Sequence, residues 1–98
     1  MKKLTSKNRK TLRSLAHHLE PVVLIGKNGV NDGVINSINL ALNTKELIKI
    51  KFRDFKDDKI NLSDFIEKKT NACKVCTIGN TIILFKESDK PENRKIKL

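Results

Sequence analysis

The order of hydrophobic and polar positions along the chain predicts seven elements: helix, strand, helix, strand, helix, strand, strand. The first helix opens at Leu4-Thr5-Ser6, where Thr5 or Ser6 caps the free N–H groups. Its apolar positions fall at i, i+3, i+4 and i+7, on one helical face: Leu12, Leu15, Ala16 and Leu19. Pro21 ends this helix, because the residue before a proline avoids the helical region.

The segment 22–25 is wholly apolar and precedes a glycine, which predicts a central strand covered on both faces. A loop with the sequence Gly-Lys-Asn-Gly follows at 26–29. Asn31 or Asp32 then caps a second helix, which runs out near residues 43–44. The positions expected on the buried face of this helix are Val34, Ile35, Ile38, Ala41 and Leu42.

Residues 46–53 alternate between apolar and cationic side chains, which predicts a strand buried on one face only. Its inward positions are Ile48, Ile50 and Phe52, and its outward cations are Lys49, Lys51 and Arg53. A charged connection then leads to a third helix at about residues 61–70. The positions expected inward on this helix are Leu62, Phe65 and Ile66, with Ile60 as a further candidate.

Two strands close the pattern, at 72–78 and 81–85, and the two-residue turn Gly79-Asn80 predicts that they form an antiparallel hairpin. After Lys86 the chain becomes charged and loses any apolar period. We therefore expect one domain over residues 1–87, followed by a mobile charged tail over 88–98.

The element order predicts an α/β fold, a compact α-β-α-β-α-β-β domain with a four-stranded mixed sheet. Strand–helix–strand crossovers imply parallel pairing, and the final hairpin adds an antiparallel pair. The loop 26–29 then lies at the carboxyl end of the first strand, where open α/β sheets usually place their ligands.

The chemistry of this loop favours an anionic backbone as its ligand. Gly26 and Gly29 permit a tight turn and a close approach, and Lys27 supplies positive charge. Asn28 can hydrogen-bond a phosphate, a 2′-OH or a base edge. The helix that follows points free N–H groups toward the loop. A Gly-x-x-Gly loop clamps nucleotides in one class of RNA-binding module, although most such loops are plain turns.

The charge balance supports a polyanionic partner, with 21 Lys and Arg against 11 Asp and Glu and a net charge of +10. A first group of cations lies on the first helix, away from its apolar stripe: Lys3, Lys7, Arg9, Lys10 and Arg13. A second is the outward row Lys49, Lys51 and Arg53. The alternative for both groups is an ordinary solvated face, because most of these cations are lysines in a chain biased toward Lys, Ile and Asn.

Other classes of function find little support in the sequence. It has no apolar run long enough to span a membrane and no apolar segment behind its first lysines, and two cysteines without a disulfide framework favour a cytoplasmic protein. No nucleophile–base pair or phosphate-loop lysine is present, so we expect neither catalysis nor a cofactor. Three further sets contain potential metal ligands, but we expect structural or solvated roles for all of them: His17 with His18, Cys73 with Cys76 (expected on opposite faces of a strand), and Asp54 with Asp57 and Asp58.

Four blocks of the sequence together resemble the CRM domain (chloroplast RNA splicing and ribosome maturation), over roughly residues 2 to 86. The blocks are Leu4-Thr5-Ser6-Lys7-x-Arg9-Lys10-x-Leu12-Arg13-x-Leu15-Ala16-His17, Val23-x-Ile25-Gly26-Lys27-Asn28-Gly29-Val30, Glu46-Leu47-Ile48-Lys49-Ile50-Lys51 and Val75-x-x-Ile78-Gly79-x-Thr81-Ile82-Ile83-Leu84-Phe85-Lys86. They occur in the family's order and spacing. The last block departs from the family's usual Leu-Tyr-Arg ending, which puts an RNA contact at that strand end in doubt.

This resemblance implies a fold similar to the C-terminal domain of bacterial translation initiation factor three, and it implies RNA binding. A stand-alone bacterial member is expected to associate with ribosomal RNA in precursors of the large ribosomal subunit, and we assume a monomer. Two alternatives stay open: a module that docks on acidic ribosomal or assembly proteins, and a translation cofactor directed at tRNA or mRNA.

Overall fold

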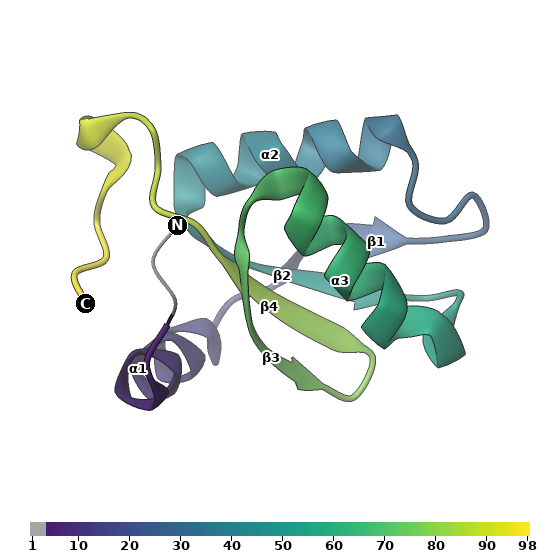
Figure 1. Ribbon diagram of the computed structural model, residues 1–98, viewed down its shortest axis with the longest axis horizontal. Coiled ribbons are helices and arrows are strands. Elements are labelled where there is room, and N and C mark those ends of the chain that lie inside the picture. Colours follow the sequence, from purple (N-terminus) through teal and green to yellow (C-terminus); the bar gives the residue numbers. More distant parts are fainter. Residues whose placement is uncertain (1–3) are drawn as a thin grey trace.

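The computed structural model describes residues 4–98, so Lys3 lies outside the described part of the chain. The elements are α1 (Ser6–Ala16), β1 (Pro21–Ile25), α2 (Asp32–Lys45), β2 (Leu47–Phe52), the 3-10 turn η1 (Lys56–Asp58), α3 (Lys59–Thr70), β3 (Cys73–Ile78), β4 (Thr81–Phe85) and the 3-10 turn η2 (Pro91–Asn93) (Figure 1). The predicted element order is confirmed, as is the α/β class. No helix within residues 4–98 is long and apolar enough to cross a membrane.

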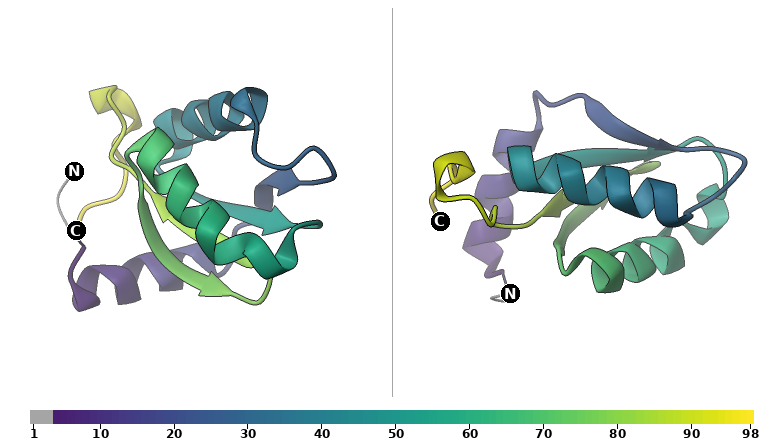
Figure 2. Two further views of the ribbon diagram at one scale, coloured as in Figure 1. Left: turned by 45° about the vertical axis from the view of Figure 1, so that its right-hand side comes forward. Right: turned by 90° about the horizontal axis from the view of Figure 1, so that it is seen from above.

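The four strands form one mixed sheet in the order β1-β2-β4-β3. Strands β1 and β2 pair in parallel, and β4 lies antiparallel to both β2 and β3. Helices α2 and α3 lie on one side of the sheet and α1 on the other (Figure 2). The hairpin turn has Gly79 at φ +56°, a left-handed conformation that glycine adopts without strain.

The sheet separates two hydrophobic cores. The core beneath α2 and α3 contains Val23, Ile25, Ile38, Leu42, Ile48, Ile50, Phe52, Ile66, Ala72, Ile82 and Leu84. The smaller core beneath α1 contains Leu4, Leu12, Ala16, Leu47, Val75, Ile83 and Phe85. The alternation predicted for β2 is confirmed, because Ile48, Ile50 and Phe52 all enter the first core.

The prediction that the first strand is central was wrong. β1 is an edge strand that pairs only with β2, and the side chains of Val22 and Leu24 are 40% and 45% exposed. An unbroken apolar run predicts burial on both faces, but only Val23 and Ile25 enter a core. Helix α1 packs instead over the other end of the sheet, against β2, β3 and β4.

Helix α1 is shorter than predicted. Thr5 caps it as expected, with its hydroxyl oxygen accepting the Asn8 N–H at 3.0 Å. The helix ends at Ala16, however, and only Leu12 and Ala16 are buried on it, while Leu15 and Leu19 are 49% and 37% exposed. Because the helix ends before Leu19, the predicted apolar stripe is never completed.

Helix α3 also buries a different stripe from the one predicted. Ile66 is buried and Leu62 is partly buried, as expected, but Phe65 and Ile60 are exposed. Ser63 and Thr70 are buried instead, and both hydroxyls donate to helical carbonyls, to Ile60 O at 2.7 Å and to Ile66 O at 2.8 Å. Such bonds make small polar side chains acceptable in a buried stripe.

Strand β3 contains a bulge that overturns the prediction for its two cysteines. Cys73 pairs with Phe85 and Cys76 with Ile83, which leaves Val75 as the extra residue. The bulge places both cysteines on the same face, where they pack against the core beneath α1. Burial raises the pKa of the Cys73 thiol; Glu67 adds to this effect and Arg9 opposes it.

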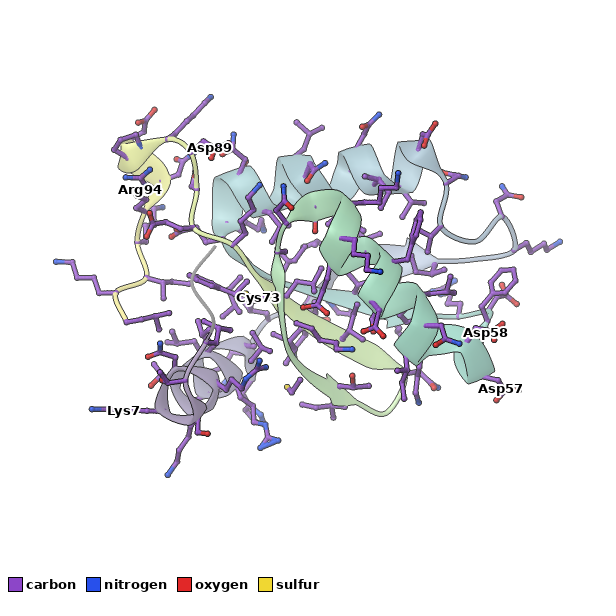
Figure 3. All side chains as sticks on the ribbon, in the orientation of Figure 1. Lys7, Asp57, Asp58, Cys73, Asp89 and Arg94 are labelled. Atoms are coloured by element: carbon purple, nitrogen blue, oxygen red, sulfur yellow. The ribbon has the colours of Figure 1, made fainter. Side chains whose placement is uncertain are left out.

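The segment 88–98 differs from the expected mobile tail, because it is held by a buried carboxylate. Glu46, at φ +64° after α2, is fully buried and accepts N–H bonds from Ser88 at 2.9 Å and Lys95 at 2.8 Å. The Ser88 hydroxyl also donates to Asn43 O at 2.6 Å, and Ile96 packs against the core beneath α1. Figure 3 shows Asp89 and Arg94 in this folded-back segment. Because polar contacts hold residues 88–98 in place, this segment shows no apolar periodicity from which the sequence could predict its fold.

We predict that Glu46→Gln lowers the free energy of unfolding by about 1–3 kcal/mol. The new amide NH₂ group would face a backbone N–H whose hydrogen bond the carboxylate accepts, so that bond would be lost. Urea denaturation measures the loss, and limited proteolysis should then release residues 88–98 first. Glu92→Gln, at an exposed position in η2, is the matched control. Equal stability of the two variants would contradict an anchoring role for Glu46.

Candidate nucleic-acid interface

The loop 26–29 is a closed turn that displays two polar side chains. The Gly29 N–H donates to Gly26 O at 3.0 Å, and Gly29 has a left-handed φ of +66°. Lys27 and Asn28, between the two glycines, are exposed. The loop connects β1 to α2 at the right-hand end of the molecule in Figure 1.

A second segment fixes the base of this turn. The Ile25 carbonyl accepts two N–H bonds, from Arg53 at 2.9 Å and Asp54 at 3.1 Å. The Phe55 ring closes the same side, since a Cβ on Gly29 would lie 3.5 Å from it. The turn is therefore attached to the chain that leaves β2.

The two glycines of the loop have different structural roles. Gly29 is required by its left-handed backbone, which a side chain adopts only with strain. Gly26 has no positive φ, and a Cβ added there meets nothing within 4 Å. The space beside Gly26 is therefore open to solvent, on the side where a ligand can come close to the backbone.

The amino terminus of α2 follows the loop directly. Asn31 caps the helix, with its side-chain oxygen accepting the Val34 N–H at 3.0 Å, as predicted. The remaining N–H groups of the first turn have no partner within the helix and attract negative charge. The carboxylate of Asp32 in the same turn offsets part of this attraction.

The row Lys49, Lys51 and Arg53, which lies on β2 and on the residue after it, leads from the end of α1 to the loop. Lys49 Nζ lies 3.5 Å from the His17 carbonyl oxygen just after α1. Lys51 pairs in register with Leu24, and the Arg53 N–H bonds to Ile25 immediately before the turn. At about 3.4 Å per residue, the row spans roughly 14 Å. Sequence alone did not show whether this row adjoins the loop, and the structure places its Arg53 end there.

Helix α1 covers only part of the sheet face that carries this row. Beside it lies a shallow hollow of about 350 Å³, lined by His17, Leu19, Glu20, Pro21, Lys49, Lys51, Ile78, Thr81 and Ile83. Lys51 and Arg53 are exposed, and Lys49 is partly exposed. The side of the sheet that α1 leaves open is therefore both cationic and accessible.

The cations predicted on α1 divide into two groups. Lys7, Lys10 and Arg13 are exposed, and Figure 3 shows Lys7 extending away from the helix. Arg9 instead donates from one nitrogen, Nη1, to Lys74 O at 2.6 Å and to Val75 O at 2.9 Å, at the β3 bulge. This contact gives Arg9 a structural role in attaching α1 to the sheet.

We predict that Arg9→Ala lowers the free energy of unfolding by about 1–3 kcal/mol, because it leaves two strand carbonyls without their charged donor. Arg13→Ala, which removes an exposed arginine from the same helix, should change it by about 0.5 kcal/mol or less. Urea denaturation compares the two variants. If both are equally stable, the bonds to β3 contribute nothing measurable.

Two sets of potential metal ligands, for which the sequence favours a structural or solvated role, can be placed in the structure. No group of three or more His, Cys, Asp or Glu within residues 4–98 is arranged to hold a metal ion. His17 and His18 contact each other edge to face, with ring centroids 5.2 Å apart. Asp54, Asp57 and Asp58 are exposed in the connection after β2.

Sequence reasoning missed one residue beside the loop, Phe55. It stands among charged residues in a connection that was interpreted as a solvated turn. An isolated aromatic residue in such a segment is the only signal that could have drawn attention to it.

The CRS1/YhbY (CRM) domain model matches residues 4–86. The chain belongs to the CRM-domain family. A Bacillus subtilis relative, "Probable RNA-binding protein YqeI", is 45% identical over 96 residues, which cover 97% of this chain and 98% of the relative. A Haemophilus influenzae protein named "RNA-binding protein" is 40% identical over 91 residues, 92% of each chain.

A solved structure has the same fold as this CRM-domain protein. The solution structure of the protein SAV1595 from Staphylococcus aureus matches with a TM-score of 0.79 and 34% identity, covering 97% of this chain and all of that one. The departure at the end of β4 can now be placed, because Phe85 is buried in the core beneath α1. The Phe85 ring is therefore part of a hydrophobic core of this chain.

Proposed function

We propose that this protein binds RNA through the loop 26–29 and the cations that lead to it, and that it acts by binding alone. The observation that carries the proposal is the turn itself, which presents Lys27 and Asn28 beside open space while its base is fixed. The names of the relatives, which describe RNA-binding proteins, support the same ligand class.

In the proposed complex, the RNA sugar-phosphate backbone approaches the open side of Gly26. Lys27 neutralises a phosphate, and Asn28 hydrogen-bonds a phosphate, a 2′-OH or a base edge. The free N–H groups of α2 attract the same backbone. Each of these groups is present on the free protein, so little rearrangement is needed on binding.

The row Lys49, Lys51 and Arg53 and the exposed cations Lys7, Lys10 and Arg13 extend the proposed surface from the loop toward α1. Contacts of this kind position a protein on RNA without reading its sequence. Their number should set how steeply the affinity falls with salt, because each phosphate contact releases counterions.

We further propose that the RNA belongs to precursors of the large ribosomal subunit, so that the protein is a ribosome assembly factor. This step rests on the resemblance to stand-alone bacterial CRM domains. We propose that it acts as a monomer in the cytoplasm.

A second candidate, docking on an acidic ribosomal or assembly protein, is favoured by one observation. Exposed aliphatic side chains occur on α1, in the connection after it, on β1 and at the end of β3: Leu15, Leu19, Val22, Leu24 and Ile78. Protein interfaces commonly combine apolar and cationic side chains. Co-purification with pre-ribosomal particles that resists ribonuclease would favour this candidate over RNA binding.

We predict that the double variant Lys27→Ala, Asn28→Ala binds large-subunit precursor RNA several-fold more weakly. The logarithmic salt slope of its affinity should fall by about 0.7–0.9, the share of one phosphate contact. Binding titrations at several salt concentrations measure both quantities. Lys68→Ala, Asn61→Ala on α3 is the matched control, since both residues are exposed there.

Unchanged affinity and slope in the folded loop variant, with folding checked by circular dichroism, would show that the loop is only a structural turn. RNA contact would then have to lie on α1 and β2, and the same titrations with Lys51→Ala would detect it.

We predict that Gly26→Ala leaves the free energy of unfolding within about 0.5 kcal/mol of its original value, because the added methyl group meets nothing. The same variant should bind RNA several-fold more weakly, because the methyl group occupies the space used by the sugar-phosphate backbone. Gly79→Ala is the comparison, because its Cβ also meets nothing but its backbone is left-handed. This variant should lower the free energy of unfolding and leave RNA binding unchanged. Full RNA affinity of Gly26→Ala would exclude a close approach at that glycine.

A further inference from the structure

Phe55 is an exposed aromatic side chain beside the loop, with its ring 3.5 Å from the position that a Cβ on Gly29 would take. The chain has four phenylalanines and no other aromatic residue of the Phe, Tyr or Trp type. Phe52 and Phe85 are buried, whereas Phe55 and Phe65 are 43% and 41% exposed. Phe65 lies on α3, where Lys69 Nζ stands 5.6 Å from its ring centroid. Phe55 instead lies next to the Gly29 end of the loop, and much of its ring faces solvent.

The backbone holds this ring in place at a conformational cost. Phe55 has φ +58° and ψ 34°, a left-handed conformation that is rare for bulky residues. The hydrogen bonds on both sides fix it, with Arg53 and Asp54 donating to Ile25 O and Asp58 donating to Phe55 O at 3.0 Å. Conformations of this kind tend to occur at functional sites, and here the strained residue is one that touches the loop.

The charges around the loop balance one another. The connection 53–59 carries Arg53, Lys56 and Lys59 against Asp54, Asp57 and Asp58, and Lys27 is matched by Asp32 beyond the loop. Figure 3 shows Asp57 and Asp58 at the end of the molecule where the loop lies. Electrostatic attraction is therefore weaker here than farther along the row, at Lys49 and Lys51. A ligand held at the loop needs a contact that does not depend on charge, and an exposed ring provides one.

We propose that Phe55 is a stacking platform for an unpaired RNA base whose backbone rests on the loop 26–29, which makes single-stranded RNA the ligand class. This inference rests on the proposed RNA-binding function and adds the kind of RNA. Every base has a flat π-face, so the contact tolerates any sequence, whereas a paired base is covered by its neighbours.

The first test compares Phe55→Leu with Phe65→Leu, a control that removes an equally exposed ring from α3. The probes are single-stranded oligoadenylate and oligouridylate, and a fully paired duplex of the two. Phe55→Leu should weaken single-strand binding by roughly five- to tenfold with an unchanged salt slope, because stacking releases no counterions. Duplex binding should not change, and Phe65→Leu should affect neither.

The second test uses the absence of tryptophan from the chain and does not depend on how well the leucine variant folds. Phe55→Trp keeps an aromatic ring on Gly29 and introduces a single fluorophore. Its emission should be quenched by the single-stranded oligonucleotides and not by the duplex. Phe65→Trp should show no quenching with any of the three.

The proposal is overturned if Phe55→Leu binds as tightly as the unchanged protein, or if Phe55→Trp is quenched equally by duplex and single strand. In either case the loop variant Lys27→Ala, Asn28→Ala would still show whether the loop binds RNA. If the unchanged protein binds none of the probes and no precursor RNA, the proposed function itself fails. If an acidic, leucine-rich peptide quenches Phe55→Trp while RNA does not, the ring docks a protein and the stacking role is wrong.

Discussion

The parallel pairing of β1 with β2, and above all its last step at Ile25, determines the geometry of the candidate site. The Ile25 carbonyl accepts N–H bonds from both Arg53 and Asp54, so two connections from distant parts of the sequence leave the sheet at one point. One connection becomes the exposed turn 26–29 and the other places Phe55 against Gly29. Without this junction the cations of β2 would end far from the loop, and the base of the turn would lose its hydrogen bonds to the chain after β2.

The position of α1 has a similar consequence for the opposite face of the sheet. Arg9 and the β3 bulge hold the helix over one end of that face, where Leu12 and Ala16 complete the smaller core. Because α1 stops at Ala16, the face beside it stays open, and Lys51 remains exposed on it. The same short helix thus closes a core and leaves a cationic surface uncovered.

The sequence predicted what depends on neighbouring residues and failed where distant residues decide. Each helix cap was narrowed to two neighbouring residues, which include Thr5 and Asn31, and Gly79-Asn80 was identified as a turn, because each signal lies within a few positions. The edge position of β1 depends on which strands pair, and a wholly apolar run carries no such information. The folded-back segment 88–98 depends on Glu46, about 40 residues earlier, whose place in the pattern looked like the start of an amphipathic strand.

The candidate site shows the same division. Lys27, Asn28 and the β2 row could be named from composition and spacing, because a Gly-x-x-Gly loop and alternating cations are local patterns. Phe55 could not, since only the fold places it beside Gly29, some 26 residues away in the sequence. For Arg9 the sequence suggested an outward cation, and only the bulge at Val75 reveals two carbonyls in reach of its guanidinium.

The distribution of charge separates two kinds of contact within one small domain. Cations dominate along α1 and β2, where contacts to phosphates would be strong at low salt and indifferent to RNA sequence or strandedness. Charges cancel around the loop, where the open side of Gly26 and an exposed ring offer contacts that salt does not screen. If both surfaces act on one RNA, the cations of α1 and β2 attract any RNA. The loop and the exposed ring then hold only strands with an accessible backbone and an unpaired base. Under that condition, a domain of this size prefers incompletely folded RNA without reading its sequence, because RNA folding removes unpaired segments.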